Sequence, residues 1–584
     1  MEPPVEIGFA LPVRTGGLDR MMAQELLQSM GLSQQEMRVS AQDKRLEALV
    51  ALSAGWGKLF EPQAPDFSPG AMGEVNDPPT QKPPTQALPT QALGWQLAPE
   101  PFPLSVAQYE ALERLGPVLW QFLQGLNQLH RQSLSGQQPA WVAQWLDQGK
   151  PEALLRFAQM KRFRNDLPRV IRPDLLITEP PSASLPAPSS SVTNPGFALC
   201  EIDAVPGGLG FTSGLNALYR QAGFSPLEGV GPIHNQADSN RVQPPVADLP
   251  QAFWQMLCEQ ASQSPFVTDR QSPVVAIVIS DEAKDYWAEM QWLAEHLQRA
   301  HGASIYVVHP RQLVFLRDAL WMEGEAIPGG RLRIDLIYRF FELFDLPNIP
   351  QMELIQYAVK KGFVQCTPPF RPASEEKLSL ALLHHPVLER FWRQHLGEDN
   401  FAWLSRLVPQ TWVLDPTPLP PHATIAGLQP GGFPVQSFQE LMTLSQKERE
   451  LVIKPSGFSP QAWGSRGVVI GHDVSSEAWQ AALNQALGAF HTTPHLLQRF
   501  HKPAAIPWQA IVAASAENTG AEPSAYAPVV LKPAKVRVRL CPYYLVMNNQ
   551  PQLAGVLATA CPADKKIIHG MKDAMLAPVA LATN

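Results

Sequence analysis

The chain has 584 residues, too many for a single hydrophobic core, so we expect roughly two to four domains. Its hydrophobic content of 45% is that of a globular protein, and its net charge of −7 argues against nucleic acid as a partner. The five cysteines are widely spaced, which fits neither a disulfide framework nor a zinc site and indicates a reducing compartment. No signal-peptide pattern opens the sequence, and no apolar run approaches the roughly 18 residues that cross a bilayer. We therefore expect a cytoplasmic protein with no membrane partner.

The first hundred residues divide into two stretches. Residues 1–60 carry helical periodicity, which predicts an N-terminal helical segment. Residues 61–103 repeat Pro-Thr-Gln, at Pro79, Pro84 and Pro89, in a low-complexity run that cannot bury a core. We interpret this stretch as a Pro-rich linker, and a docking motif for a proline-recognising partner is the alternative.

From residue 104 onward, helical and strand patterns alternate. Residues 104–270 combine a helical region with two strand patterns, "VIRPDLLI" and "FALCEIDAV". Residues 271–349 show the order strand, helix, strand, from "PVVAIVIS" to "SIYVVHP", which predicts a Rossmann-like unit with a parallel sheet. Residues 350–584 are mostly helical up to 448 and rich in hairpins after it. The predicted fold class is α/β, with α+β character.

The stretch "LVIKPSGFSPQAWGSRGVVIG" predicts a strand, a long loop and a second strand, with Lys454 near the end of the first. A lysine beside a glycine loop suits phosphate, because its ammonium supplies a point charge and glycine lets backbone N–H groups approach closely. The loop is not a Walker A motif. The alternative is a surface hairpin with a partly buried lysine.

Two further strands carry charge on one face. In "CEIDAVPGG", Glu201 and Asp203 lie two residues apart, so both carboxylates project from the same face and suit Mg²⁺ that arrives with a nucleotide. In "VVLKPAKVRVRL", Arg537 and Arg539 alternate with apolar residues, and their guanidinium groups suit phosphate and carboxylate oxygens. A solvated strand face is the alternative for each.

Taken in order, these motifs resemble the circularly permuted ATP-grasp family, which includes glutathionylspermidine synthase. In that family a strand reading Lys-Pro precedes a glycine loop, as "VIKPSGFSPQAWGSRGVVIG" does here, and "HLLQRFHKP" and "SEEKLSLALLHHPVLERF" resemble two further elements. The resemblance covers roughly residues 165–584. The sequence departs from the family at "CEIDAVPGG", where Asp203 replaces Asn and the proline spacing is one residue shorter.

The resemblance implies a permuted ATP-grasp fold, with residues 271–349 as a Rossmann-like pre-ATP-grasp unit and residues 350–584 as the nucleotide-binding region. It also implies roles for particular residues. The ATP-binding residues would be Lys377, Lys454, Ser456, Gly457, Gly464, Ser465, Arg466, Gly467 and Gln498. Glu201 and Asp203 would hold Mg²⁺, and Arg537 and Arg539 would be catalytic. Arg172, Asp174 and Arg339 lie where predicted strands end, so we expect them to contact the substrate.

The function that this family implies is ATP-dependent ligation of a carboxylate to an amine through an acylphosphate, with small-molecule or peptide substrates. A non-catalytic ATP-grasp domain that binds nucleotide or acts as a scaffold is the alternative. It is motivated by residues 531–584, which hold few acidic residues and where Asp564 is the candidate metal ligand that we single out. A kinase that phosphorylates a small molecule at the same site is a third hypothesis.

Overall fold

The structure is a computed structural model, and it describes residues 44–46, 48–49, 52, 96–179, 196–227, 248–264, 267, 269, 272–513, 529–568 and 574–582. The predicted helical segment 1–60 lies outside these residues except for the few positions between 44 and 52, which are helical. The predicted linker 61–103 lies outside them up to residue 95. Its last part contains strands β1 (Gln96–Leu97) and β2 (Phe102–Leu104), which both pair in parallel with β19 (Met575–Leu581).

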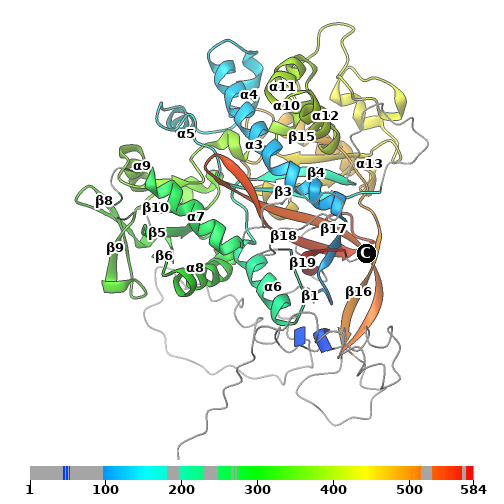
Figure 1. Cartoon of the computed structure of the whole chain (residues 1–584). Helices are drawn as coiled ribbons and strands as arrows, with labels where there is room; N and C mark the ends of the chain where they lie inside the picture. Colours follow the sequence, from blue (N-terminus) through cyan, green and yellow to red (C-terminus); the bar gives the residue numbers. More distant parts are fainter. Residues whose placement is uncertain are drawn as a thin grey trace, which may run out of the picture.

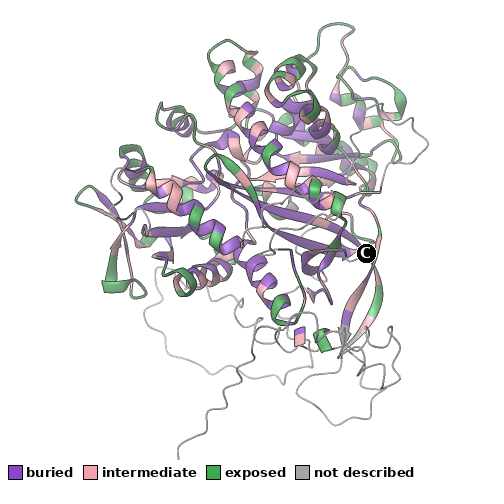
Figure 2. Cartoon of the chain, viewed as in Figure 1, coloured by how far each residue is buried: buried purple, intermediate pink, exposed green. Residues whose placement is uncertain are grey.

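The largest sheet occupies the centre of the molecule (Figure 1). Its strand order is β1-β19-β18-β17-β3-β4, with β16 added beside β17 and β2 beside β19. The remaining strands are β3 (Val170–Ile177), β4 (Phe197–Asp203), β16 (Ile506–Ala513), β17 (Val529–Met547) and β18 (Gln550–Pro562). The strand patterns predicted at "VIRPDLLI" and "FALCEIDAV" are therefore confirmed, and the two strands pair antiparallel. Most of β17 and β18 is buried (Figure 2), because helices cover both faces of the sheet.

One face of this sheet packs against the long helix α3 (Val106–Leu134) and a group of shorter helices. Ser105 caps α3 in a capping box with Gln108, which satisfies the first free N–H groups of the helix. Buried residues such as Leu112, Leu119 and Leu126 place the apolar face of α3 on the sheet. The shorter helices on this side are α4 (Ala140–Asp147), α5 (Glu152–Ala158), α10 (Ser379–His384), α11 (Glu389–Leu396) and α12 (Glu398–Leu407).

The predicted β-α-β unit forms a separate parallel sheet of order β11-β10-β5-β6. The crossover helix α8 (Trp287–His301) joins β5 (Val275–Ile279) to β6 (Ile305–Val308), and β10 (Leu336–Phe340) and β11 (Gln365–Thr367) complete the sheet. Every residue of β5 is buried, as expected for a strand covered on both faces. Helices α6 (Leu209–Gln221), α7 (Leu249–Ser262) and α9 (Met352–Lys361) surround it, and β7 (Leu313–Leu316), β8 (Ala319–Glu323) and β9 (Arg331–Arg333) form a small sheet beside it.

A third sheet holds the predicted lysine strand. Its order is β12-β15-β13-β14, with bounds Thr411–Val413, His495–Arg499, Leu451–Pro455 and Val469–Ile470, and α13 (Ser476–Gly488) packs on it. The strand-loop-strand prediction is confirmed, because Val452 lies opposite Ile470 in an antiparallel pair. The prediction that residues 350–448 are mostly helical is confirmed for α9 to α12 only. Prolines in "DPTPLPPHA" prevent regular helix in the stretch that follows β12.

The fold is thus a mixed α/β architecture of several sheets, with α+β character. Within the described residues, no helix is both long and apolar enough to cross a membrane.

A buried carboxylate fixes the glycine turn that follows β4. Gly208 begins α6 with a φ of 90°, a conformation that favours glycine. Glu289 of α8 accepts hydrogen bonds from the N–H groups of Gly208, at 2.7 Å, and Phe211, at 3.2 Å. Burial raises the pKa of Glu289 to about 7, although these hydrogen bonds oppose the shift.

The substitution Glu289→Gln tests this contact through pH. A carboxyl group whose pKa rises on folding stabilises the protein fully below its unfolded pKa, and that stability is lost as pH rises through the folded value. Wild type should therefore lose up to about 3 kcal/mol from Glu289 between the unfolded pKa and pH 7. The variant should lack this part of the pH dependence, which denaturant titrations at several pH values measure. Parallel curves for the two proteins would contradict the assignment.

Candidate functional site

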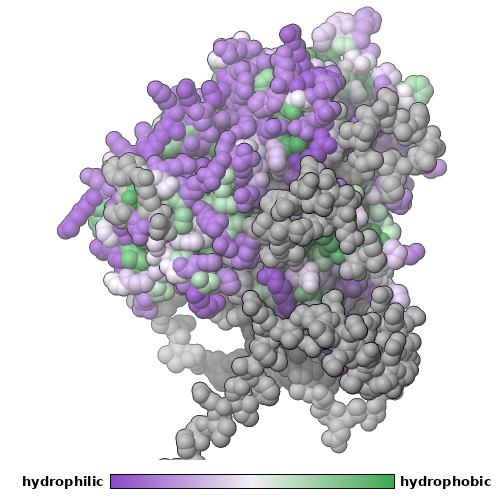
Figure 3. Space-filling model, viewed as in Figure 1, coloured by the Kyte–Doolittle hydropathy of each residue, from purple (hydrophilic) through white to green (hydrophobic). Residues whose placement is uncertain are grey.

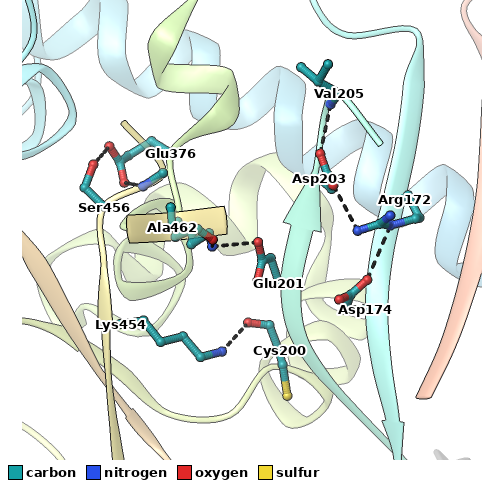
Figure 4. Close-up of polar contacts among 12 residues, drawn as sticks. Arg172, Asp174, Cys200, Glu201, Asp203, Val205, Glu376, Lys454, Ser456 and Ala462 are labelled. Atoms are coloured by element: carbon teal, nitrogen blue, oxygen red, sulfur yellow. Dashed lines mark hydrogen bonds and ion pairs between the residues drawn. The ribbon is translucent and has the colours of Figure 1, made fainter. Parts of the chain in front are cut away.

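Two lysines from different parts of the chain converge on strand β4 (Figure 4). Lys454 of β13 donates to the carbonyl oxygen of Cys200 at 3.1 Å and to Oε1 of Gln498 at 2.9 Å. Lys377, just before α10, contacts Oε1 of Glu201 at 2.7 Å and donates to the carbonyl oxygen of Ala462 at 3.1 Å. The structure therefore brings together four of the predicted site residues and the loop that follows β13.

A second set of charges continues across the same sheet onto β3 and β17. Nη2 of Arg172 lies 2.9 Å from Oδ2 of Asp203, and Nε of Arg172 lies 3.4 Å from Oδ1 of Asp174. Nη1 of Arg539 lies 2.7 Å from Oδ2 of Asp174. These residues come from three neighbouring strands, and Figure 4 shows Arg172, Asp174, Glu201 and Asp203 on β3 and β4. We call the two lysines and these five charged side chains, Arg172, Asp174, Glu201, Asp203 and Arg539, the charge cluster.

Burial and neighbouring charges shift the pKa values of Lys377, Asp174 and Asp203 in the cluster. Burial alone would lower the pKa of Lys377, but the Glu201 carboxylate raises it above the ordinary value, so the ammonium stays charged. Burial alone would raise the pKa of Asp174, but the guanidinium groups of Arg539 and Arg172 bring it below the ordinary value. Burial raises the pKa of Asp203, with Arg172 opposing. The cluster therefore contains fixed positive charges that could neutralise phosphate oxygens.

Three consecutive residues, Glu375, Glu376 and Lys377, hold the segment that brings Lys377 to the cluster. Glu376 lies 2.6 Å from Nζ of Lys150, and both side chains are fully buried. The same carboxylate accepts from Oγ of Ser456 at 2.6 Å and from the N–H of Gly457 at 3.1 Å. On either side of it, Glu375 pairs with Arg339 and Lys377 pairs with Glu201.

Sequence reasoning missed Glu375, Glu376 and Lys150. The run Glu-Glu-Lys before an apolar helix was a signal for the first two, because adjacent charges beside a buried segment need partners. Nothing near Lys150 in the sequence pointed to its partner, which lies 226 residues away.

The predicted glycine loop has a different role at each glycine. A Cβ on Gly457 would lie 2.0 Å from the carbonyl oxygen of Glu375, so this glycine permits close packing of two backbone segments. A Cβ on Gly467 would lie 2.8 Å from the ring of Pro455. Gly464 has a φ of 55°, and a Cβ added there would meet nothing within 4 Å among the described atoms. It ends the short 3₁₀ turn together with Ser465, whose side chain lies outside the described part.

Three predicted site residues lie apart from the charge cluster. Arg339 is fully buried, and its guanidinium contacts Glu375 and the carbonyl oxygens of Pro368 and Pro369, so it has a structural environment rather than a substrate-facing one. Arg537 donates to the carbonyl oxygen of Lys565 at 3.1 Å. The Arg466 side chain is 66% exposed and lies 3.8 Å from Glu282. Gln498, one of the predicted ATP-binding residues, contacts Lys454 and Thr411.

The charge cluster could hold a metal ion only together with ligand oxygens. Glu201 and Asp203 supply two carboxylates on one strand, and no group of three or more His, Cys, Asp or Glu side chains with metal-binding geometry occurs within the described residues. Mg²⁺ is commonly bound by one or two carboxylates plus phosphate oxygens, so the two residues fit magnesium bound with a nucleotide. Cys200 adjoins the site, but burial raises the pKa of its thiol to about 11, which disfavours a nucleophilic role.

Comparisons with known proteins give a likeness to solved structures but none to protein families or curated sequences. No protein-family model matches the chain, and no curated protein sequence does either. Among solved structures, the chain is similar to a glutathione synthetase-like effector from Globodera pallida in its apo form, with 10% identity and a TM-score of 0.45. The match covers 83% of this chain and 90% of that one. At this TM-score the function has to be argued from the chain's own geometry.

The first test of the site concerns the buried pair of Lys150 and Glu376. Lys150→Met should cost about 3–5 kcal/mol, because it leaves the Glu376 carboxylate buried without its cation. Arg156→Met is the matched control, since Arg156 pairs with Glu152 where both side chains are largely exposed, and it should leave stability unchanged. Equilibrium denaturation measures both. Equal stability of the two variants would show that Lys150 does not hold Glu376.

The second test concerns Gly457. The substitution Gly457→Ala should destabilise the protein by about 1–3 kcal/mol, because the added methyl group meets backbone that cannot move aside cheaply. Gly488→Ala is the control, since no atom lies within 4 Å of its added Cβ. Thermal unfolding compares the two. If Gly457→Ala is as stable as the control, the segments around 375 and 457 are not packed as described.

Proposed function

We propose that the chain is an ATP-dependent carboxylate–amine ligase with the charge cluster as its nucleotide and reaction site. The observation that carries the proposal is the convergence of Lys377 and Lys454 on two adjacent residues of β4, beside a glycine-containing loop. Two ammonium groups fixed by separate elements can bind several oxygens of a polyphosphate at once. The ATP-grasp resemblance of the sequence supports the same reaction, and residues 350–584 are its proposed nucleotide-binding region.

The residues of the chain would act by positioning and charge neutralisation, which dominate phosphoryl transfer. Lys454 and Lys377 would exchange their present acceptors, the Cys200 carbonyl and the Glu201 carboxylate, for phosphate oxygens. Glu201 would then be free to hold Mg²⁺ together with Asp203, which would also have to give up its contact with Arg172. The bound ion would neutralise phosphate charge. Arg539 would hold the negative charge of the acyl phosphate, and the loop after β13 would exclude water from it.

The substrates follow from this reaction class. The first would carry a carboxylate that takes the γ-phosphoryl group, and the second an amine that displaces phosphate to form an amide. Arg172, beside Asp203 at the edge of the cluster, is the proposed contact for the carboxylate substrate.

A non-catalytic nucleotide-binding or scaffold protein is the second candidate, and one observation favours it. Each cation of the cluster already has an acceptor within the protein, so the charges are satisfied without a ligand. A ligand must therefore compete with these contacts, and a site that evolved for structure would look the same.

Thermal unfolding with and without millimolar Mg-ATP tests the proposal on wild type, Lys454→Ala and Lys377→Ala. A ligand at 100 times its dissociation constant adds about 2.7 kcal/mol, which raises the melting temperature by several degrees. Wild type should show this shift, and both alanine variants should lose most of it. Lys447→Ala is the control, because Lys447 is an exposed lysine in the same region and should shift like wild type.

The next measurement separates the two candidates. ADP release from Mg-ATP in the presence of paired acids and amines, with detection of an amide product, would establish a ligase. A nucleotide shift without ADP release under any pair would favour the non-catalytic protein. No shift in wild type would remove the charge cluster as a nucleotide site.

A further inference from the structure

A polar pocket lies between α3 and residues 371–373, and none of its described lining residues belongs to the charge cluster. Its volume is about 840 Å³. Its other walls come from the end of α4, from α5 and from the turns after α5. Hydrophilic residues also cover the surface around α5 (Figure 3). We call this pocket the amide groove, because glutamine and asparagine side chains are the largest group among its lining residues.

The polar face of α3 builds one wall of the amide groove. Gln124, Gln128 and Gln132 are four residues apart, so they form a line along one side of the helix, opposite the apolar side on the sheet. Within the part of the chain that the structure describes, the side chains of Gln124 and Gln128 make no hydrogen bond. Free amides in a concave site offer both donors and acceptors to a ligand.

Three guanidinium groups make the amide groove electropositive. Arg164 has no side-chain partner among the described residues, and Arg131 donates to Oδ1 of Asn165 at 2.8 Å. Arg371 is 4% exposed, and its guanidinium donates only to neutral oxygens, those of Asn127, Ala158 and Phe163. Its Nε has no partner within the described residues.

Neither of the two carboxylates that act electrostatically on Arg371 forms an ion pair with these arginines; one is Asp166, and the other is the acidic residue of the described lining. It is Asp147, which contacts Nε2 of His130 at 2.9 Å rather than a guanidinium. A buried guanidinium without a carboxylate in direct contact is costly, and an anionic ligand nearby would offset that cost.

The residues that line the groove favour a carboxylate over a phosphate as its anionic ligand. The described residues that line it include no lysine and no glycine, so the glycine-rich backbone cradle typical of phosphate sites is missing there. Planar guanidinium groups match carboxylates in two-point contacts, and the amides match peptide-like groups beside them. We infer that the amide groove binds a small ligand that carries carboxylates next to an amide, such as an N-acylated acidic amino acid or an acidic dipeptide. This inference is independent of the proposed nucleotide site.

Isothermal titration calorimetry with N-acetylglutamate, N-acetylaspartate and glycylglutamate tests the inference on the full chain. At least one of these ligands should bind wild type, and added salt should weaken the binding. Arg131→Gln and Arg164→Gln should each weaken it about tenfold, because each removes a charge-assisted hydrogen bond. Both are exposed side chains, so the variants should fold.

Two control variants and a neutral ligand show whether binding depends on the charges of the groove. Arg156→Gln lies on α5 outside the lining and should bind like wild type, as should Lys454→Ala in the charge cluster. N-acetylglutaminamide keeps the amides without carboxylates and should bind more weakly than N-acetylglutamate. The inference is overturned if none of the three acids binds, or if Arg131→Gln and Arg164→Gln bind them as wild type does. Tighter, Arg164-dependent binding of inorganic phosphate would also overturn it.

Discussion

The arrangement of the molecule depends on three consecutive ion pairs made by Glu375, Glu376 and Lys377. Glu375 reaches Arg339 in the parallel sheet, Glu376 reaches Lys150 and the loop after β13, and Lys377 reaches Glu201 in the central sheet. One short segment therefore connects three parts of the fold. Removing two charges from water costs several kcal/mol per ion, so a fully buried pair such as Lys150 and Glu376 adds little net stability. The pair instead fixes the position of Glu376, because a carboxylate that accepts from four donors can occupy only one place.

This positioning explains why two lysines meet at β4. Lys454 is set by its strand and by Gln498, which in turn donates to Thr411 of the neighbouring strand. Lys377 is set by the segment that precedes it. Neither lysine needs a ligand to hold its place, which reduces the entropy lost when a polyphosphate binds. The cost appears elsewhere, since the ligand must displace the contacts to Cys200 and Glu201. Such a site therefore binds its ligand less tightly but holds the two lysines in a fixed geometry.

The sequence predicted the strands better than it predicted the burial and the partners of their side chains. The strands that contain Arg172, Glu201 and Lys454 were predictable, because an alternating or continuous apolar run indicates a strand from local sequence alone. Their meeting was predictable only through the family resemblance, which links distant motifs. The burial of Arg339 was not predictable, because we expected it where its strand ends, whereas it lies inside β10 and its partner Glu375 belongs to a later element. Lys150 shows the same limit more strongly, since tertiary packing pairs it with a residue 226 positions away and no periodicity records that.

The stretch of chain from Arg371 to Lys377 connects the two sites, since Arg371 lines the amide groove and Lys377 belongs to the charge cluster. Between them, buried contacts fix the backbone at Glu375 and Glu376, and Gly457 packs directly on it. A segment held at this many points moves little by itself, because each contact would have to break or move together with the others. The side of the site with freedom to respond to a ligand is the exposed part of the loop, around Gly464 and Arg466, where the described contacts are sparse.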